Sequence, residues 1–308
     1  MVGSYGSRAF LLCLKIACIL NRMSFMAVHI IKNINDPRVS MFHSLKGKDL
    51  ENEGIFIAEG KRVAERLLEA GIEVVSCLTT DKVYKKFKLL LRKAEKNGVP
   101  VYVGNKKDLG KIIGFRFHQG ILIAAKAPER KKTEDVVKKK KKGHLLVALN
   151  NITDPENVGL IVRNAGAFGA DAIIVDGRTC SPYYRKSVRV AMGVIFNLPL
   201  AYEGSLVPKL KWLKKEFGTR IIVTSPAARN KNISNIDTSG NICLVFGNEG
   251  EGVSPEISRL ADLKVKIPVS SWVDSINVAC ASSVFLHHVS MERNQKVPSS
   301  KDQVANIA

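Results

Sequence analysis

Short apolar runs alternate with longer amphipathic stretches through residues 144–292, and this pattern predicts the fold of the second half of the chain. Each run holds four or five residues, which is typical of a strand that is buried on both faces. The expected strands are Leu145–Leu149, Ala172–Val175, Arg220–Thr224, Ile242–Phe246 and Val265–Val269.

The stretches between these runs carry helix signals. Asp154-Pro155 places a capping side chain before a proline in the first helical turn, and a second helix is expected to start near Ser254 with Pro255 in its first turn. Further helices are expected over Tyr183–Met192, from Ser205 to a stop at Gly218, and from about Ser275. Because helices alternate with strands, we predict an α/β fold with a mainly parallel sheet covered on both faces.

Residues 27–127 predict a separate, small α/β domain. Its expected strands are Ile55–Ala58, Glu73–Thr80, Val99–Val103 and Gly120–Ala127, and its expected helices are Glu59–Ala70 and the very basic Asp81–Asn97. Residues 128–143 are charged and poor in apolar residues, which favours a flexible linker between this domain and a second domain over 144–292. Residues 293–308 are expected to form a flexible tail.

The first 26 residues allow three interpretations. The apolar run Ala9–Leu20 contains Lys15 and is too short to span a bilayer. Arg8, Lys15 and Arg22, with no acidic residue among them, resemble an organelle-targeting peptide, whereas the apolar run itself resembles a secretory signal. The third interpretation is that translation starts at Met23 or Met26, which would make the preceding residues an extension. We expect a cytoplasmic protein, with an organelle as the alternative.

The positive charge is concentrated in the first half of the chain. The formal net charge is +20, and residues 1–143 hold 30 Lys and Arg against 14 Asp and Glu, whereas residues 144–308 hold 18 against 14. Such an excess favours a polyanionic partner, most simply nucleic acid. Arg116, Phe117 and His118 are candidates for base stacking beside phosphate contacts.

Cysteine and histidine spacing argues against a metal site. The six cysteines form no CxxC pair and several lie in apolar runs, so we expect buried, reduced thiols in an intracellular protein. Common nucleotide and hydrolase motifs are also missing, because the sequence holds no GxxxxGK[ST], GxSxG or HExxH.

A glycine-rich loop follows the strand Ile242–Phe246. Three glycines in Gly247-Asn248-Glu249-Gly250-Glu251-Gly252 let backbone groups approach a ligand closely. Its two carboxylates suit a phosphate poorly, and its spacing is not that of a dinucleotide site. This loop and the helix start near Ser275 are expected to border one pocket.

Polar residues stand at three strand ends where an apolar core does not need them: Asn157 and Arg163, Glu249, and Ser275 with Asn277. Arg163 lies six residues after Asn157, about 240° around a helix axis, so the two cannot share one face fully. Each residue also has a plain structural interpretation as a turn residue, a solvated acid or a helix cap. Their occurrence together favours one shared site.

Three segments resemble the motifs of the SpoU (TrmH-like) RNA ribose 2′-O-methyltransferases of the SPOUT superfamily. They are DPENVGLIVRNAGAFGAD, LVFGNEGEGVS and IPVSSWVDSINVACASS, in the expected order and spacing within about 145–290. Residues 35–127 resemble the L30e-like substrate-binding domain that precedes many of these enzymes. One departure is that Ser270-Ser271 stands where the family often has glycine.

The resemblance implies a trefoil-knotted domain, a homodimer whose active site takes residues from both subunits, and S-adenosylmethionine as cofactor. Backbone groups around the cofactor would come from Gly247, Asn248, Gly252, Ile267, Val269 and Ile276. The catalytic candidates that the motifs imply are Asn157, Arg163, Glu249, Ser275 and Asn277.

The predicted reaction is methyl transfer to a ribose 2′-hydroxyl of structured RNA, with rRNA favoured over tRNA. We expect Arg163 to contact the 2′-hydroxyl and an adjacent phosphate, Asn157 to orient Arg163, and the other three side chains to fix the loops. The alternative is a non-catalytic RNA-binding protein of the same fold that acts in ribosome assembly.

Overall fold

The computed structural model describes residues 28–45, 50, 53–96, 98–139, 143–227 and 231–293. The predicted targeting segment or extension at 1–26, and the predicted tail apart from Arg293, lie outside these residues. The chain forms two compact units, one from residues up to 48 together with 73–125, and one from 49–72 together with 126–308.

The second unit is built on a seven-stranded sheet in the order β10-β12-β9-β11-β6-β7-β8. Each pair of neighbouring strands is parallel, which confirms the predicted α/β fold. The strands are β6 Leu145–Asn150, β7 Ala172–Asp176, β8 Leu200–Glu203, β9 Arg220–Thr224, β10 Lys231–Asn232, β11 Ile242–Gly247 and β12 Leu263–Lys266.

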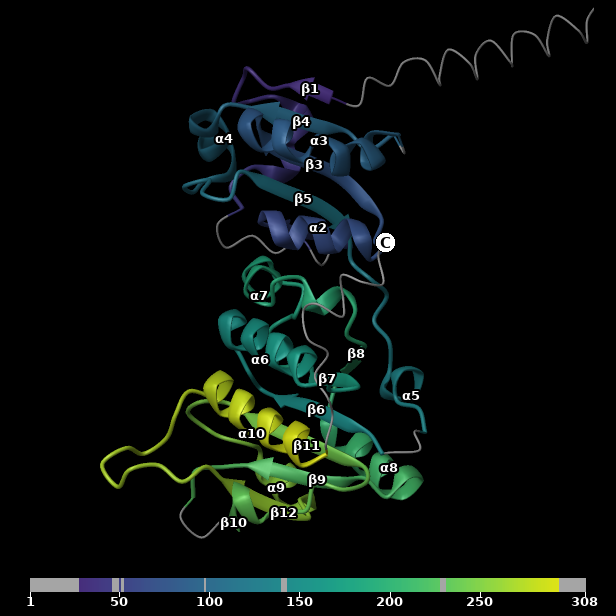
Figure 1. Ribbon diagram of the computed structural model, residues 1–308, viewed down its shortest axis with the longest axis vertical. Helices are drawn as coiled ribbons and strands as arrows, with labels where there is room; N and C mark the ends of the chain where they lie inside the picture. The colour runs from purple at the N-terminus through teal and green to yellow at the C-terminus, as the bar shows by residue number, and fades with distance from the viewer. Residues whose placement is uncertain are drawn as a thin grey trace, which may run out of the picture. The chain divides into compact units, whose positions relative to one another are not determined.

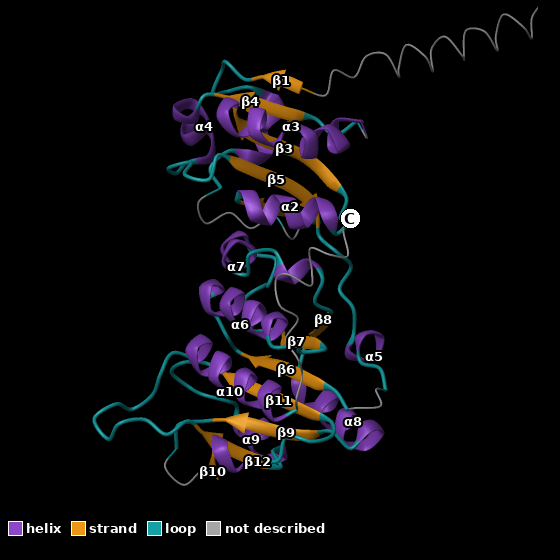
Figure 2. Ribbon diagram, viewed as in Figure 1, coloured by secondary structure: helices purple, strands orange, loops and turns teal. Residues whose placement is uncertain are grey.

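Helices connect these strands and cover both faces of the sheet (Figure 2). They are α5 Thr133–Val136, α6 Pro155–Ala167, α7 Arg185–Val190, α8 Leu206–Phe217, α9 Pro255–Leu260 and α10 Val278–Glu292, with short 3-10 turns at Val194–Phe196 and Ile233–Asn235. Figure 1 shows α6 and α10 next to each other, and the two helices pack together.

The strand β11 illustrates how the core is divided between the two faces. Val245 belongs to a buried cluster with Leu210 of α8, whereas the next residue, Phe246, packs its ring on Phe285 of α10 with 6.1 Å between centroids. Successive side chains of a strand point to opposite faces, so one strand anchors both helix layers. On this strand, burial raises the pKa of the Cys243 thiol to about 12, so it stays protonated at neutral pH.

The other sheet has five strands in the order β1-β4-β3-β5-β2. Its elements are β1 Val28–Ile30, a 3-10 helix Pro37–Phe42, β2 Ile55–Glu59, α2 Lys61–Glu69, β3 Val74–Thr80, α3 Asp81–Lys96, β4 Val101–Gly104, α4 Lys106–Ile113 and β5 Ile121–Lys126. β3 is parallel to β4 and antiparallel to β5. This mixed arrangement agrees with the predicted small α/β domain.

The segment with β2 and α2 belongs to the second compact unit, so the units do not coincide with the predicted boundaries at 27–127 and 144–292. Its buried Glu59 accepts a hydrogen bond of 2.5 Å from Arg185 of α7, and Phe56 packs its ring on Tyr183. Arg66 of α2 donates a hydrogen bond of 2.7 Å to the carbonyl oxygen of Met192. These contacts hold the segment against α7 and the residues on either side of it.

Two expected element boundaries differ from the observed ones. Residues 267–269 extend beyond β12 into a loop, and α10 begins at Val278 rather than near Ser275. Asn277 is its cap, because the Oδ1 atom accepts hydrogen bonds from the amides of Ala279 and Cys280.

The predicted linker also holds structure, since α5 lies within it. The buried Thr133 donates hydrogen bonds of 2.8 Å from both its amide and its hydroxyl to Glu203 of β8. The backbone of Lys131 forms a parallel β-bridge with Ala201, which also lies in β8. The part of 128–143 around α5 is therefore packed on the sheet edge rather than flexible. Among the described residues, no helix has the length and apolar character needed to cross a membrane.

Candidate active site

A pocket of about 490 Å³ lies at the carboxyl ends of β9, β11 and β12. The residues that line it come from the β9 end, the loop after β11, the loop after β12 and the first turns of α10: Thr224, Ser225, Pro226, Ala227, Gly247, Asn248, Glu249, Gly250, Glu251, Gly252, Val265, Lys266, Ile267, Val269, Asp274, Ser275, Ile276, Asn277, Val278, Ala281 and Phe285. Its size is within the range of about 300–1,000 Å³ that is usual for small-molecule sites. Loops at the carboxyl ends of parallel strands are the expected place for such a site.

The loop after β11 folds back on itself tightly. The backbones of Asn248 and Gly252 exchange two hydrogen bonds of 3.1 and 2.9 Å, and Gly252 has a φ of +70°, which favours glycine. A Cβ atom on Gly247 would lie 2.3 Å from the carbonyl carbon of Gly252. Gly247 is therefore required for the loop to close over itself.

The side chain of Asn248 holds this loop to the end of β6. Its Oδ1 atom accepts hydrogen bonds from the amides of Gly250 at 2.8 Å and Glu251 at 3.1 Å. Its Nδ2 atom donates to the carbonyl oxygen of Asn151 at 3.0 Å. The side chain of this predicted cofactor-binding residue therefore stabilises the loop itself.

Asn157 joins the three motif segments. Its Nδ2 atom donates a short hydrogen bond to Oε1 of Glu249, and its Oδ1 atom accepts one of 2.9 Å from Nδ2 of Asn277. Asn277 in turn caps α10 through its Oδ1 atom. The predicted set of Asn157, Glu249 and Asn277 is thus brought together as one hydrogen-bonded chain.

Arg163 lies apart from this chain. Its side chain is exposed, whereas Asn157 on the same helix is buried, as the 240° separation predicts. The side-chain amide of Asn157 hydrogen-bonds Glu249 and Asn277, and the expectation that Asn157 orients Arg163 stays a prediction. Arg163 makes no ion pair within the described part of the chain, so its charge is available to a group from outside.

Comparison with known proteins identifies the family. Residues 144–287 match the model of the SpoU rRNA Methylase family, and residues 57–131 match that of the RNA 2′-O ribose methyltransferase substrate binding domain. An uncharacterized tRNA/rRNA methyltransferase of Mycobacterium bovis is 30% identical over 258 residues, which cover 81% of this chain and 87% of the relative. The chain belongs to the SpoU family.

Other members of the SpoU family agree with this placement. The 23S rRNA (guanosine-2′-O-)-methyltransferase RlmB of Coxiella burnetii is 31% identical over 216 residues, 68% of this chain and 84% of the relative. The crystal structure of an AdoMet-bound rRNA methyltransferase from Sinorhizobium meliloti has a TM-score of 0.74 and 25% identity, and it covers 85% of this chain and 97% of its own.

In this SpoU-family pocket, the six predicted cofactor residues all line the cavity wall: Gly247, Asn248, Gly252, Ile267, Val269 and Ile276. Three predicted catalytic residues, Glu249, Ser275 and Asn277, line it as well. The Ser275 hydroxyl has no hydrogen-bond partner among the residues that the structure describes, so Ser275 does not cap α10.

Several supporting residues of the SpoU-family site were not predicted. Asp176 at the end of β7 accepts hydrogen bonds from Nδ2 of Asn150 at 2.8 Å and from the hydroxyl of Thr179 at 2.7 Å. Oδ1 of Asn150 accepts one of 2.8 Å from the amide of Ser254. Asn150 thereby links the ends of β6 and β7 to the segment after the glycine loop. Asn150 directly follows the apolar run Leu145–Leu149, and a polar residue at such a position was the sequence signal that could have identified it.

A substitution at Asn157 tests the hydrogen-bonded chain. Asn157→Asp replaces the donor to Glu249 with a second carboxylate, and we expect cofactor affinity to fall on the order of tenfold because an unpaired, partly buried acceptor costs about 1–3 kcal/mol. The double variant Asn157→Asp/Glu249→Gln restores a donor opposite an acceptor and should recover most of the affinity. Titration calorimetry with S-adenosylmethionine measures both effects, and a double variant no better than the single one would contradict this arrangement.

Proposed function

We propose that the chain is an S-adenosylmethionine-dependent RNA methyltransferase that modifies a ribose 2′-hydroxyl. The observation that carries this proposal is the pocket in which the glycine loop, the β12 loop and the start of α10 are joined through Asn157, Glu249 and Asn277. Membership of the SpoU family and the AdoMet-bound neighbour support it.

The pocket residues fit a cationic, partly apolar cofactor. Three acids, Glu249, Glu251 and Asp274, line the pocket together with a single basic residue, Lys266. Such a charge balance favours a sulfonium and an ammonium group over a phosphate. Ile267, Val269, Ile276 and Phe285 supply apolar wall for an adenine ring, and the backbone of Gly247–Gly252 supplies polar groups.

S-adenosylmethionine would supply a methyl group that is already activated on a sulfonium sulfur. The protein must then hold the ribose hydroxyl in line and stabilise the charge that develops on its oxygen. Arg163 is suited to this role because its exposed guanidinium keeps five donors available and stays charged. Glu249 and Asn277, held by Asn157, keep the pocket loops in place.

We propose that a second copy of the chain completes the site. Arg163 does not line the pocket of its own chain, and α10 carries an exposed row of Cys280, Val284, His287 and Met291. Val284 is 39% and Met291 61% exposed. A helix that is apolar almost all round is usually covered in the functional assembly. A dimer over this row would cover it and bring an Arg163 to the other pocket. The trefoil knot stays a prediction.

Substituting the exposed row tests the dimer. Val284→Glu places a charge in the proposed interface and should convert a species of twice the 33.8 kDa chain mass into a monomer with greatly reduced methyl transfer. Leu89→Glu is the matched control, because Leu89 is 79% exposed on α3 in the other unit. Light scattering after gel filtration gives the masses, and a wild-type protein that is active as a monomer would refute the dimer.

We propose rRNA as the substrate class and the cytoplasm as the place of action. The RlmB relatives are named as 23S rRNA enzymes, whereas other relatives carry tRNA/rRNA in their names. The basic first half of the chain supports binding of a large polyanion. Separate reactions with purified rRNA and tRNA test the preference, and methylation of tRNA alone would exclude rRNA.

The test of the function is transfer of a tritiated methyl group from S-adenosylmethionine to RNA lacking the modification. We expect label in RNA with wild-type protein and none without it. RNA binding without any transfer, over a range of RNA classes, would instead favour a non-catalytic role in ribosome assembly.

A further inference from the structure

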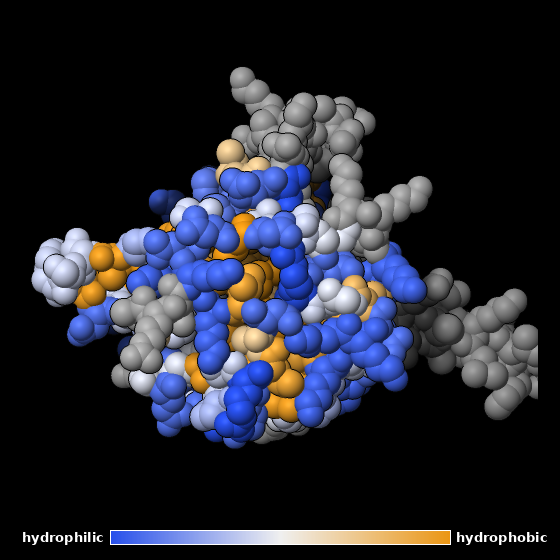
Figure 3. All heavy atoms as spheres, turned by 90° about the horizontal axis from the view of Figure 1, so that it is seen from below, coloured by the Kyte–Doolittle hydropathy of each residue, from blue (hydrophilic) through white to orange (hydrophobic). Residues whose placement is uncertain are grey.

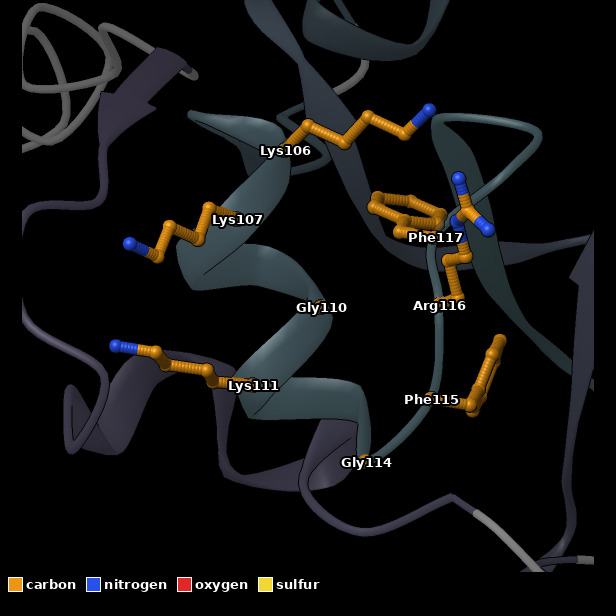
Figure 4. Close-up of a pocket in the computed structure, with 8 residues that line it drawn as sticks. All are labelled: Lys106, Lys107, Gly110, Lys111, Gly114, Phe115, Arg116 and Phe117. Carbon is orange, nitrogen blue, oxygen red and sulfur yellow. The ribbon is translucent and has the colours of Figure 1, made fainter.

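A second pocket, of about 660 Å³, lies in the first compact unit between α4 and the segment that follows it. It is lined by Lys106, Lys107, Gly110, Lys111, Gly114, Phe115, Arg116 and Phe117 (Figure 4). None of these residues belongs to the candidate active site. The size is within the range of about 300–1,000 Å³ for sites that hold a small molecule or a single nucleotide.

Two glycines line this pocket. Gly110 is in the middle of α4, where the helix packs closely on residues 115–117, because an added Cβ would be in van der Waals contact with the carbonyl oxygen of Phe115 at 3.4 Å. Gly114 ends the helix with a φ of +80°, a conformation that favours glycine. Glycine inside a helix costs roughly 1 kcal/mol relative to alanine, so Gly110 is present at the expense of helix stability.

Four exposed cationic residues line the pocket: Lys106, Lys107, Lys111 and Arg116. None of them makes an ion pair with a described residue. The nearby Asp108 belongs to the first turn of α4, where its amide donates a hydrogen bond to Oδ1 of Asn105 and its carboxylate accepts one from Nδ2 of Asn105. Figure 4 shows Lys106 and Arg116 extending to one side and Lys107 and Lys111 to the other. Lys106 and Arg116 therefore place positive charge on the side of the segment that carries Phe115, whereas Lys107 and Lys111 extend away from that segment.

The two phenylalanines differ in what they offer a ligand. Phe117, predicted as a stacking residue, is only 1% exposed and belongs to the core, so that prediction is wrong. Phe115 is half-buried and lines the pocket. In Figure 4 its side chain extends to the same side as Arg116. An aromatic ring beside unpaired cations is the combination that binds single-stranded nucleic acid, where bases stack and phosphates meet positive charge.

We propose that this pocket binds an unpaired nucleotide of the RNA substrate, with its base against Phe115 and the adjoining phosphates at Lys106 and Arg116. The proposal rests on the proposed RNA methyltransferase function and assigns it a second RNA contact, separate from the reacting ribose. Single-stranded RNA fits better than an acidic protein segment because the pocket combines an apolar floor with cations at its rim. Duplex RNA presents no unstacked base to such a floor.

The double variant Lys106→Ala/Arg116→Ala tests the phosphate contacts in the full-length chain. Each lost contact to single-stranded RNA lowers the slope of log affinity against log salt by about 0.7, so the double variant should lower it by about 1.4. The control is Lys88→Ala/Arg92→Ala, which removes the same charges from exposed positions of α3. Fluorescence anisotropy with a labelled, unstructured RNA oligonucleotide gives the slopes. An equal change in the control would mean diffuse attraction and overturn the proposal.

The variant Gly110→Leu tests the pocket without removing charge. A leucine side chain would project into the pocket from this lining position, and we expect affinity for the oligonucleotide to fall on the order of tenfold, the loss of one stacked base. Gly110→Ala is the control, since its Cβ makes an ordinary contact and helix stability should rise by roughly 1 kcal/mol. Thermal unfolding reports whether Gly110→Leu remains folded, and unchanged affinity in a folded variant would overturn the proposal.

Methyl transfer and cofactor binding are measured on the same proteins. A wild-type protein that transfers no methyl group would refute the proposed function. A wild-type protein that methylates RNA, with pocket variants that bind and methylate as well as it does, would refute this site alone. We expect the pocket variants to keep cofactor affinity and to show a higher KM for RNA with a kcat near that of wild type.

Discussion

Arg163→Ala should lower methyl transfer to RNA on the order of a thousandfold, because it removes the donor proposed to stabilise charge on the ribose oxygen. Cofactor affinity should stay near that of wild type, since Arg163 does not line the pocket of its own chain. Single-turnover transfer of a labelled methyl group and titration calorimetry measure the two quantities separately.

Two variants sharpen this test. Arg163→Lys keeps the charge but loses the planar fork of donors, and it should recover only part of the activity. Arg259→Ala is the matched control, because Arg259 is exposed on α9 and pairs with Glu256 at 3.7 Å on the same helix. Full activity in Arg163→Ala would refute the assigned role.

Gly247→Ala should lower cofactor affinity by about a hundredfold or more and reduce the free energy of unfolding by about 1–3 kcal/mol, a typical cost of overpacking. The added Cβ would lie 2.3–2.5 Å from backbone atoms of Gly252 and Val253, and backbone cannot yield as a flexible side chain does. The loop must open, and the pocket wall moves with it.

The control for this prediction is in the same loop. Gly250→Ala adds the same methyl group, but its Cβ would meet only Oδ1 of Asn248, at 3.5 Å, and the position has no positive φ. We expect nearly wild-type affinity and stability from it. Equal losses in both variants, measured by calorimetry and thermal unfolding, would mean that general loop rigidity matters rather than the close approach at Gly247.

The regular elements were predictable where local signals and burial agree. Asp154 caps α6 and Gly218 ends α8 as the sequence indicates, because capping depends on neighbouring residues alone. α4 was missed although Asn105, Asp108 and Gly114 carry its start and stop signals. The apolar residues 267–269 predict a continuation of the strand, yet Val269 is 41% exposed and lines the pocket. Apolar residues that face a ligand cannot be told from core residues by periodicity.

The site was predictable as a set of residues but not as a set of contacts. The motif resemblance selected Asn157, Glu249 and Asn277, and the structure adds that Asn157 binds the other two. Sequence spacing separated Arg163 from Asn157 on the helix, but it carried no information on whether Arg163 serves its own pocket. Phe115 and Phe117 are two residues apart in one segment, and only the packing of the chain decides that Phe117 is the buried one.

Apolar surface on the second unit is the remaining feature that one chain does not explain. Figure 3 shows apolar residues in patches between hydrophilic ones on the face seen from below. Trp272, in the loop between β12 and α10, is 85% exposed. Side chains of this kind in the loops around a site are usually covered when substrate or a second copy binds.

The central claim is that the methyl group reaches a ribose 2′-oxygen. RNA labelled by the wild-type protein with a tritiated methyl group is hydrolysed in alkali, which cuts only next to a free 2′-hydroxyl. The account predicts that the label stays in alkali-resistant dinucleotides, and that digestion to nucleosides releases it as 2′-O-methylated nucleosides. Label in mononucleotides that carry a methylated base would contradict it.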